Sequence, residues 1–393
     1  MIPLVVKKEK IGPIIGRHPW VYSKALLYIP EGLSPGEPVK LIDERGRFLA
    51  TGYFNSYSQI SVRIWGYEEN EAIDLNFFRR RISEALSIRK KYVEKGNTNA
   101  YRVINSEGDF LPGLVVDKYG EYLVVQFHTK GMEYWRKNVI SALMEVIKPK
   151  GIYERSEIYS TLDGKPEEKN EPIVGKIPDL IKVKENGLDF LVDIKRGQKT
   201  GFFLDQRDKR NALRKYVKGA RVLNCFSYTG GFAVYAFAGG AESVINIDTS
   251  QDALELAKEN VKLNGFKTEK VENIKGDVKK VLTSQDESYD VIILDPPAFI
   301  KDRRKKERGL AGYKYINKRA MELLNKNGLL VTCSCSYHLN LQEFRYLITE
   351  VAANARSSFR ILEVFTHGLD HPVPLPFIEG EYLKCFFLRC SKN

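Results

Sequence analysis

The second half of the chain alternates strand and helix patterns, and this rhythm limits the fold more than any other feature. Apolar segments that predict strands occur at residues 221–225, 243–247, 271–274, 290–294, 329–333, 359–364 and 382–388. A well-marked helix lies between the second and third, from an N-cap at Ser250 to a stop at Gly265. This alternation predicts a mostly parallel, doubly wound α/β sheet, whose ligands bind beyond the carboxyl ends of its strands.

The first three strand ends carry residues suited to an adenosyl group. A glycine turn after the first strand allows a ligand to approach the backbone and a helix N-terminus. Asp248 ends the second strand, where a carboxylate can accept both ribose hydroxyls, and Asp277 follows the third, where it can accept the adenine amine. The glycine spacing differs from G-x-G-x-x-G, so we predict S-adenosylmethionine rather than a dinucleotide. The turn residues assigned to the cofactor are Asn224, Phe226, Ser227, Tyr228, Thr229 and Gly230.

The fourth strand runs into Asp295-Pro296-Pro297-Ala298-Phe299. Two prolines fix the backbone and remove two N–H donors, which leaves Asp295 and nearby carbonyl oxygens as acceptors at the strand end. This arrangement suits a nucleobase held by its amine and ring nitrogens at Asp295 and Pro296, with Phe299 stacked on it. We assign Asp295 both to the cofactor site and to catalysis. The alternative is a rigid turn that only caps a buried strand.

The fifth strand carries Cys333 and Cys335 on one face, with Cys335 at the strand end and level with Asp295. A thiolate at Cys335 could add to C6 of a cytosine and make C5 nucleophilic enough to accept a methyl group. The alternative is that both are buried structural thiols. No second Cys/His cluster has ligand spacing, so we predict no metal site.

Two further segments are candidates for ligand contact. Residues 197–207 precede the glycine turn, and Phe202, Asp205, Gln206 and Arg207 are predicted to close over the methionine part of the cofactor. The alternative is that these four only pack the domain. Near the N-terminus, His18 and Trp20 could stack on RNA bases or could belong to the core of a small barrel.

Positive charge is concentrated after the Asp-Pro-Pro turn. The chain has 62 Lys and Arg against 50 Asp and Glu, for a net charge of +12. Nine of these cations but only two carboxylates lie between Lys301 and Arg319. Excess positive charge favours polyanions, so we predict that Lys301, Arg303 and Arg304 contact RNA phosphates, although such a run can also be a solvated loop.

The length of 393 residues favours two or three domains. We predict a small β-barrel over residues 1–70, a linker helix near 73–93 with an α+β domain over 71–190, and the doubly wound domain over 191–393. The polar run 163–170 predicts a solvated loop. No apolar stretch approaches the roughly 20 residues that span a bilayer, and five cysteines form no disulfide framework. The expected location is therefore the cytoplasm, without a membrane.

Together these motifs resemble the large-subunit ribosomal RNA methyltransferase I family over nearly the whole chain. Residues 17–22 resemble the start of that family's RNA-binding PUA module, and residues 102–114 resemble its central α+β domain. The resemblance implies a class I, Rossmann-like methyltransferase that forms 5-methylcytosine in ribosomal RNA, with Cys335 as nucleophile. Since the family is frequently dimeric, it also implies a homodimer.

Two other functions stay open at this point. Asp-Pro-Pro-x-Phe turns also occur in enzymes that methylate guanine at N7 or at exocyclic amines without a covalent intermediate, so guanine is an alternative substrate. A third hypothesis is a non-catalytic RNA-binding assembly factor, which the barrel and the basic run both suit.

Overall fold

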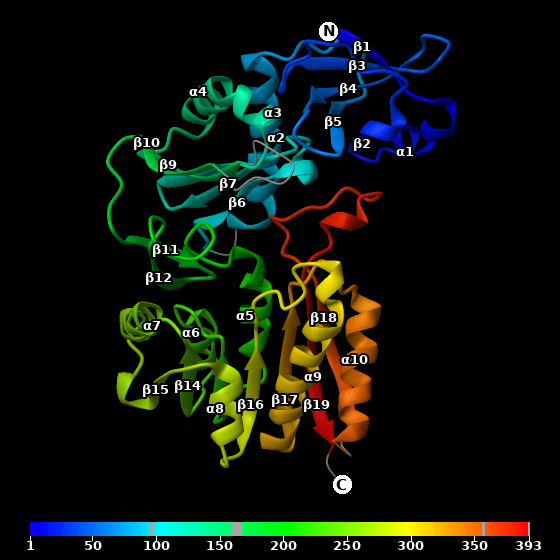
Figure 1. Ribbon diagram of the computed structural model, residues 1–393. Coiled ribbons are helices and arrows are strands. Elements are labelled where there is room, and N and C mark those ends of the chain that lie inside the picture. Colours follow the sequence, from blue (N-terminus) through cyan, green and yellow to red (C-terminus); the bar gives the residue numbers. More distant parts are fainter. Residues whose placement is uncertain (95–96, 159–166, 356–357, 392–393) are drawn as a thin grey trace. The chain divides into compact units, whose positions relative to one another are not determined.

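The computed structural model describes residues 1–94, 97–158, 167–355 and 358–391. Figure 1 shows its elements along the chain. The chain divides into two compact units. Unit 1 comprises Met1–Lys184, Val192–Leu204 and Leu369–Gly380, and unit 2 comprises Glu185–Leu191, Asp205–Gly368 and Glu381–Asn393. The domain boundaries at residues 70 and 190 stay predictions.

The N-terminal part of unit 1 is a five-stranded sheet with the order β1-β3-β4-β5-β2. Only β1 and β3 pair in parallel, and the other neighbours are antiparallel. Its core consists of aliphatic residues such as Leu4, Val39, Leu41 and Val62. The elements are β1 (Ile2–Val5), α1 (Gly12–Ile15), β2 (Trp20–Tyr22), β3 (Pro38–Ile42), β4 (Phe48–Phe54) and β5 (Ile60–Gly66).

A second five-stranded sheet completes unit 1, with the order β10-β9-β8-β7-β6. The predicted linker helix is confirmed as α2 (Leu75–Tyr92). The helix begins there because the Asp74 side chain caps it by accepting the Phe77 N–H at 2.9 Å. Two further helices in this part of the chain meet at Trp135. The elements are β6 (Ala100–Asn105), β7 (Leu114–Tyr119), β8 (Tyr122–Phe127), α3 (Lys130–Tyr134), α4 (Arg136–Ile147), β9 (Gly151–Ile158) and β10 (Glu167–Val174).

The prediction of a loop over residues 163–170 is wrong for its second half. Residues 163–166 lie outside the described residues, but Glu167–Asn170 begin β10 and pair with β9 in antiparallel register. Most of β10 is exposed, so its polar composition reflects an edge strand held by backbone hydrogen bonds. A two-stranded sheet of β11 (Ile181–Glu185) and β12 (Leu188–Val192) follows, with Asn186 and Gly187 at the turn.

Unit 2 contains the predicted doubly wound sheet, with the strand order β15-β14-β13-β16-β17-β19-β18. Pairing is parallel from β15 to β17, while β19 is antiparallel to both of its neighbours. The strands are β13 (Arg221–Cys225), β14 (Ser243–Asp248), β15 (Val271–Lys275), β16 (Tyr289–Leu294), β17 (Leu324–Ser334), β18 (Ser358–Phe365) and β19 (Lys384–Ser391). All seven strand predictions are confirmed, with β17 beginning five residues earlier than expected.

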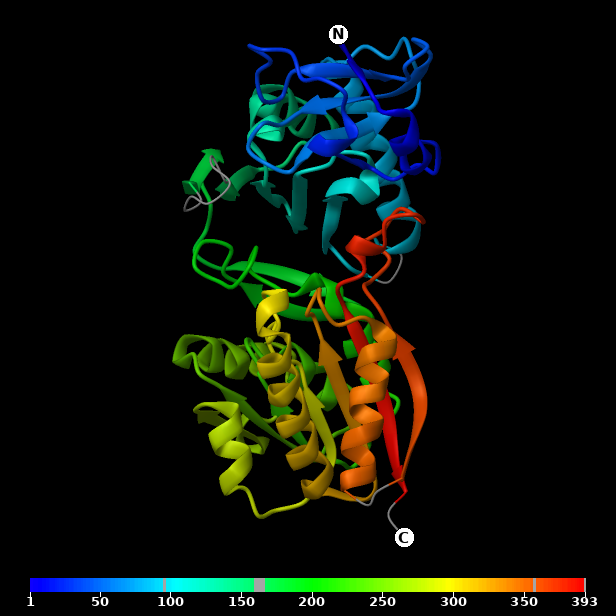
Figure 2. The ribbon, with the colours of Figure 1, turned by 45° about the vertical axis from the view of Figure 1, so that its right-hand side comes forward.

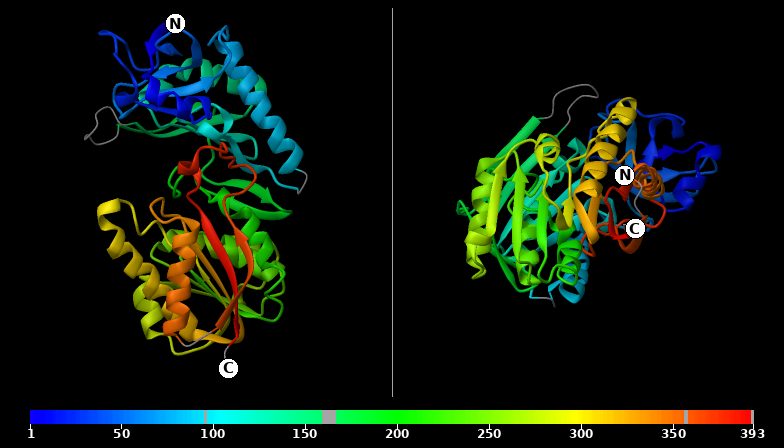
Figure 3. Two further views of the ribbon diagram at one scale, coloured as in Figure 1. Left: turned by 90° about the vertical axis from the view of Figure 1, so that its right-hand side faces the viewer. Right: turned by 90° about the horizontal axis from the view of Figure 1, so that it is seen from below.

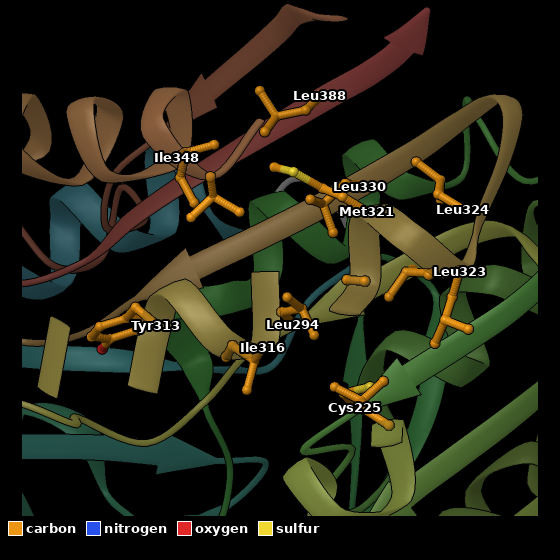
Figure 4. Packing of buried hydrophobic residues seen from close by; sticks show 14 of the residues in the cluster. Cys225, Leu294, Tyr313, Ile316, Met321, Leu323, Leu324, Leu330, Ile348 and Leu388 are labelled. Carbon is orange, nitrogen blue, oxygen red and sulfur yellow. The ribbon is translucent and has the colours of Figure 1, made fainter. Parts of the chain in front are cut away.

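Helices cover both faces of this sheet, as Figures 2 and 3 show. Side chains of α8, α9 and α10 form one core with β13, β16, β17 and β19, and Figure 4 shows part of this packing around Leu294, Leu330 and Leu388. The helices are α5 (Arg207–Leu213), α6 (Gly231–Ala238), α7 (Gln251–Leu263), α8 (Val278–Ser284), α9 (Lys306–Leu323) and α10 (Leu341–Asn354). Within the described ranges, none of the helices has the length and hydrophobicity needed to cross a membrane.

Candidate active site

The glycine turn after β13 has an unusual backbone. Phe226, Tyr228 and Gly230 all have left-handed φ angles, of 60°, 46° and 73°. Left-handed geometry costs a non-glycine residue roughly 1–2 kcal/mol, and such residues cluster at binding and catalytic sites. At Gly230 a side chain has no room, since a Cβ there would lie 2.7 Å from the Cβ of Ala257. The turn is therefore a strained, closely packed entrance to α6.

The Asp248 carboxylate holds this turn against the end of β14. One carboxylate oxygen accepts the Tyr228 N–H at 2.9 Å, and the other accepts the Ser250 N–H at 3.0 Å. Asp248 is 8% exposed. The predicted carboxylate thus stands at the predicted strand end, where it orients two backbone segments and retains acceptor capacity for a ligand.

Several buried polar atoms line the same strand ends without a hydrogen-bond partner in the described chain. They are Gln206 Oε1, Asn224 Oδ1, Ser227 Oγ and Thr229 Oγ1. An unsatisfied buried polar atom costs roughly 1–3 kcal/mol, and buried polar groups in native proteins nearly always have partners. All four residues were assigned to the cofactor from the sequence. Their placement is that of a site whose ligand completes the hydrogen bonding.

The segment before α5 brings one of its four predicted residues, Gln206, to the Asp295 turn. Gln206 donates through Nε2 to the Asp295 carboxylate at 2.7 Å, and Tyr382 donates its hydroxyl to the Asp205 carboxylate at 2.7 Å. Arg207 is buried at the start of α5. Phe202 belongs to unit 1, where its N–H donates to the Tyr119 hydroxyl at 3.2 Å.

Asp277 has a role that the sequence did not indicate. Its side chain caps α8 by accepting the Lys280 N–H at 3.1 Å, and the residue is exposed. Asp-type caps of this kind stabilise helices by about 1 kcal/mol. Its assignment to the adenine amine stays a prediction.

Cys335 and Cys333 have different environments. Cys335 follows β17, is half-buried, and points its Sγ at the carbonyl oxygen of Pro296, 3.7 Å away. Cys333 is buried opposite Cys385 in the β17–β19 register, and its hydrogen bond with Cys385 together with burial raises the pKa of its thiol well above the usual value. Cys225, Cys385 and Cys390 are also buried. Only Cys335 among the five cysteines therefore reaches partial exposure.

The expectation that Cys335 lies level with Asp295 is wrong by two residues. Leu294 pairs with Thr332, so continuing this register places Asp295 beside Cys333. The apolar pattern locates the two strands but carries no information on the register between them. Cys335 lies farther along, and its Sγ contacts the carbonyl oxygen of the next residue of the turn, Pro296.

A hydrogen-bond cluster fixes the chain on both sides of Cys335. The Tyr313 hydroxyl lies 2.9 Å from Ser336 Oγ and accepts from Ser334 Oγ at 3.1 Å. Ser336 Oγ also accepts the Ile300 N–H at 3.1 Å. These bonds connect α9, the end of β17 and the Asp-Pro-Pro loop, and so they position the thiol.

Phe299 packs on the protein itself. Its ring centroid lies 4.8 Å from that of Tyr313 and 6.3 Å from that of Phe226, and Lys279 Nζ lies 4.9 Å above it. The ring is half-buried. Gly309 of α9 permits this approach, since a Cβ there would lie 2.8 Å from the Phe299 carbonyl oxygen. Its stacking on a substrate base stays a prediction.

Sequence reasoning missed Lys384, the first residue of β19. Lys384 is 2% exposed, and its Nζ donates to the carbonyl oxygens of Ser336 and Tyr382, both at 2.8 Å. The available signal was a lysine at the start of the apolar run 385–388. Across the described ranges, no group of three or more His, Cys, Asp or Glu side chains could hold a metal ion.

The basic run extends from the Asp-Pro-Pro loop into α9. Lys301 and Arg303 are exposed, while Arg304, also exposed, pairs with Asp302 at 2.7 Å. Lys306 and Lys314, farther along, pair with Glu343 and Glu350 of α10, both at 2.6 Å. Part of the positive charge is thus neutralised within unit 2, and the residues predicted to contact phosphate lie where the run is exposed.

His18 and Trp20 line a pocket of about 420 Å³ in unit 1 together with Lys10 and Lys24. His18 Nε2 lies 3.3 Å from the Glu379 carboxylate. Trp20 donates its indole N–H to Glu107 at 2.8 Å and packs on Phe377, with ring centroids 4.7 Å apart. The two residues therefore line this pocket and are not members of the aliphatic core of the first sheet.

Comparisons with known proteins agree with this architecture. Residues 160–380 match the model of an S-adenosylmethionine-dependent methyltransferase family, and residues 4–66 match that of a PUA-like domain. The chain is 41% identical to ribosomal RNA large subunit methyltransferase I of Cronobacter sakazakii, over 98% of each chain. It is 40% identical to the protein of that name from Escherichia coli K12, over 99% of each.

Among solved structures, the chain resembles SMU.776, a protein assigned as a methyltransferase and solved in complex with SAH. The TM-score is 0.85 at 24% identity, covering 99% of this chain and 100% of that one. This likeness concerns the fold.

The fold and the matched models define an S-adenosylmethionine-dependent methyltransferase with a PUA-like domain, which confirms the predicted fold class and cofactor. More narrowly, the chain belongs to the ribosomal RNA large subunit methyltransferase I family, as its motifs indicated.

The residues at the strand ends fit this cofactor. Its ribose hydroxyls, amines and carboxylate are hydrogen-bonding groups, and the buried oxygens of Gln206, Asn224, Ser227 and Thr229 have no partner in the described chain.

Proposed function

We propose that this protein methylates C5 of a cytosine in large-subunit ribosomal RNA, with Cys335 as the covalent nucleophile. The observation that carries the proposal is the half-buried Cys335 thiol, 3.7 Å from the Pro296 carbonyl oxygen in the Asp-Pro-Pro turn. The ribosomal substrate is taken from the relatives, which are named for it.

The chemistry requires a nucleophile because C5 of cytosine does not react with a methyl donor unaided. Addition of the Cys335 thiolate to C6 forms an S–C6 bond and gives C5 enamine character. When bound, S-adenosylmethionine supplies an electrophilic methyl group, which C5 accepts. A base then removes the C5 proton, the S–C6 bond breaks, and the thiolate is restored together with the C5–C6 double bond.

Asp295 and Pro296 are proposed to hold the cytosine. The turn offers acceptors, and a cytosine amine is a donor, so their hydrogen bonding is complementary. Gln206 occupies one Asp295 oxygen at 2.7 Å and thereby orients the carboxylate. Lys301, Arg303 and Arg304 are proposed to contact the flanking phosphates, and His18 and Trp20 are proposed to contact bases elsewhere on the RNA.

The test compares Cys335→Ala with Cys333→Ala. Each variant is incubated with large-subunit ribosomal RNA lacking the modification and radiolabelled cofactor, and the RNA is digested to identify the labelled nucleoside. We expect 5-methylcytidine from the parent protein and a loss of roughly 10³-fold or more for Cys335→Ala, as for removal of a covalent nucleophile. Cys333→Ala should keep the activity apart from a modest stability loss, since Cys333 is buried against Cys385.

Other outcomes separate the alternatives. Labelled methylguanosine with full activity of Cys335→Ala would establish guanine methylation without covalent catalysis. Tight RNA binding without transfer to any RNA tested, and without cofactor binding, would indicate an assembly factor. The homodimer stays a prediction, which sedimentation equilibrium can measure.

A further inference from the structure

Lys384 is one of two lysines in the described chain that are almost fully buried, the other being Lys209. It stands opposite Ser334 in the β17–β19 register, one residue before Cys335. Its Nζ also donates to the carbonyl oxygen of Ser336, one residue after Cys335, at 2.8 Å. The Lys384 side chain therefore spans the segment that carries the thiol.

The ammonium group has carbonyl oxygens as its hydrogen-bond acceptors. Its two bonds go to Ser336 and Tyr382, and among the described residues it forms no ion pair within 4 Å. Burying an ammonium without a carboxylate is costly, whereas apolar residues would satisfy the same strand position. The fold thus retains a charge that packing alone does not require.

Three groups interact electrostatically with this ammonium. Burial lowers the pKa of Lys384 to about 8. Negative charge on Cys335, Glu343 and Glu381 acts in the opposite direction and raises this pKa, with Cys335 having the largest effect of the three. Glu343 is already paired with Lys306 at 2.6 Å. Burial raises the pKa of Tyr313, and the charge of Cys335 raises it further, so Tyr313 stays a neutral phenol. Cys335 is therefore the main group that can offer Lys384 a compensating negative charge.

We propose that Lys384 is a positioning residue that holds Cys335 as a thiolate beside the Asp-Pro-Pro turn. This inference rests on the proposed function, in which that thiolate is the nucleophile. The thiol proton passes to the neutral amine or to solvent, which leaves an ammonium–thiolate pair and requires no other reactant. An adjacent cation is the usual means by which proteins favour a thiolate.

The test measures alkylation of Cys335 by iodoacetamide as a function of pH, in the full chain without cofactor or RNA. Four of the five cysteines are buried, so the half-buried Cys335 should react first, and Cys335→Ala supplies the blank. Lys384→Gln keeps donors for the two carbonyl oxygens but removes the charge, while Lys384→Met removes both. Lys314→Met, which removes a cation paired with Glu350 and outside this contact, is the matched control.

For both Lys384 variants we expect the midpoint of the rate profile to move upward by about one pH unit or more, which slows alkylation at pH 7 about tenfold. The Lys314→Met profile should match the parent. Thermal unfolding checks that Lys384→Gln is folded. If the folded variant gives the parent profile, Lys384 only tethers the loop and the inference is overturned. Full methyl transfer by Cys335→Ala would instead overturn the proposed function, and the alkylation result would be unaffected.

Discussion

Two strand ends of the unit 2 sheet, after β13 and after β17, differ in whether their buried hydroxyl groups have hydrogen-bond partners. At the β13 turn, Ser227 Oγ and Thr229 Oγ1 have no hydrogen-bond partner in the described chain. After β17, the Ser334 and Ser336 hydroxyls are both bonded to the Tyr313 hydroxyl, and Ser336 also accepts the Ile300 N–H.

The difference indicates two kinds of preorganisation. The β13 turn is held by Asp248 but leaves polar atoms for a ligand to satisfy, so its stability should depend on the cofactor. The β17 end satisfies its own polar groups, so the thiol of Cys335 should keep its position whether or not a cofactor is bound. Substitutions at the two ends should therefore separate cofactor binding from thiol reactivity.

Asp248→Ala should have the largest effect. It removes the acceptors of the Tyr228 and Ser250 N–H groups at 2.9 and 3.0 Å and the proposed partner of the ribose. We expect the dissociation constant for S-adenosylmethionine to rise at least about 100-fold, or roughly 3 kcal/mol, by calorimetry. Asp252→Ala, an exposed carboxylate on α7, is the control and should bind normally. If Asp248→Ala bound S-adenosylmethionine as tightly as the parent, the adenosyl group would not bind at the ends of β13 and β14.

Ser336→Ala should have an intermediate effect confined to the other end. It leaves the buried Ile300 N–H and the Tyr313 hydroxyl short of a partner, so the free energy of unfolding should fall by about 1–3 kcal/mol. Methyl transfer should decrease because the segment around Cys335 loosens, while cofactor binding should stay within about twofold of the parent. Denaturant unfolding and calorimetry measure the two quantities, with the exposed Ser284→Ala as control. A parallel loss of cofactor binding would contradict the independence of the two ends.

The sheet was predictable because its strands are apolar runs bounded by turn residues, and because Ser250 caps α7 through a local hydrogen bond to the Ala253 N–H. The edge strand β10 was not, since its backbone pairing with β9 overrides a polar composition. Local patterns carry no information on pairing between distant segments.

The candidate site divides in the same way. Asp248 and the glycine turn follow strand ends that the pattern locates, and the sequence therefore indicated them. The contact of Cys335 with the Pro296 carbonyl, and the burial that distinguishes Cys335 from Cys333, depend on how β17 pairs with β16 and β19. Lys384 reaches the site only through that antiparallel pairing of segments about 50 residues apart.

The smallest expected effects come from two serines, Ser227 and Ser250, which differ in whether the hydroxyl group has a hydrogen-bond partner. Ser250 Oγ accepts the Ala253 N–H at 3.2 Å, whereas Ser227 Oγ has no partner in the described chain. Without cofactor, Ser250→Ala should lower the free energy of unfolding by about 1 kcal/mol, and Ser227→Ala should leave it unchanged or raise it slightly. Saturating S-adenosylmethionine should raise the melting temperature of the parent protein. Ser227→Ala should reduce this rise, whereas Ser250→Ala should preserve it, so the variant with the smaller effect on the free protein should have the larger effect on the response to the ligand. Equal ligand-induced shifts in the two variants would mean that the unsatisfied hydroxyl at the β13 turn does not contact the cofactor, and the contrast between the two strand ends would lose its functional meaning.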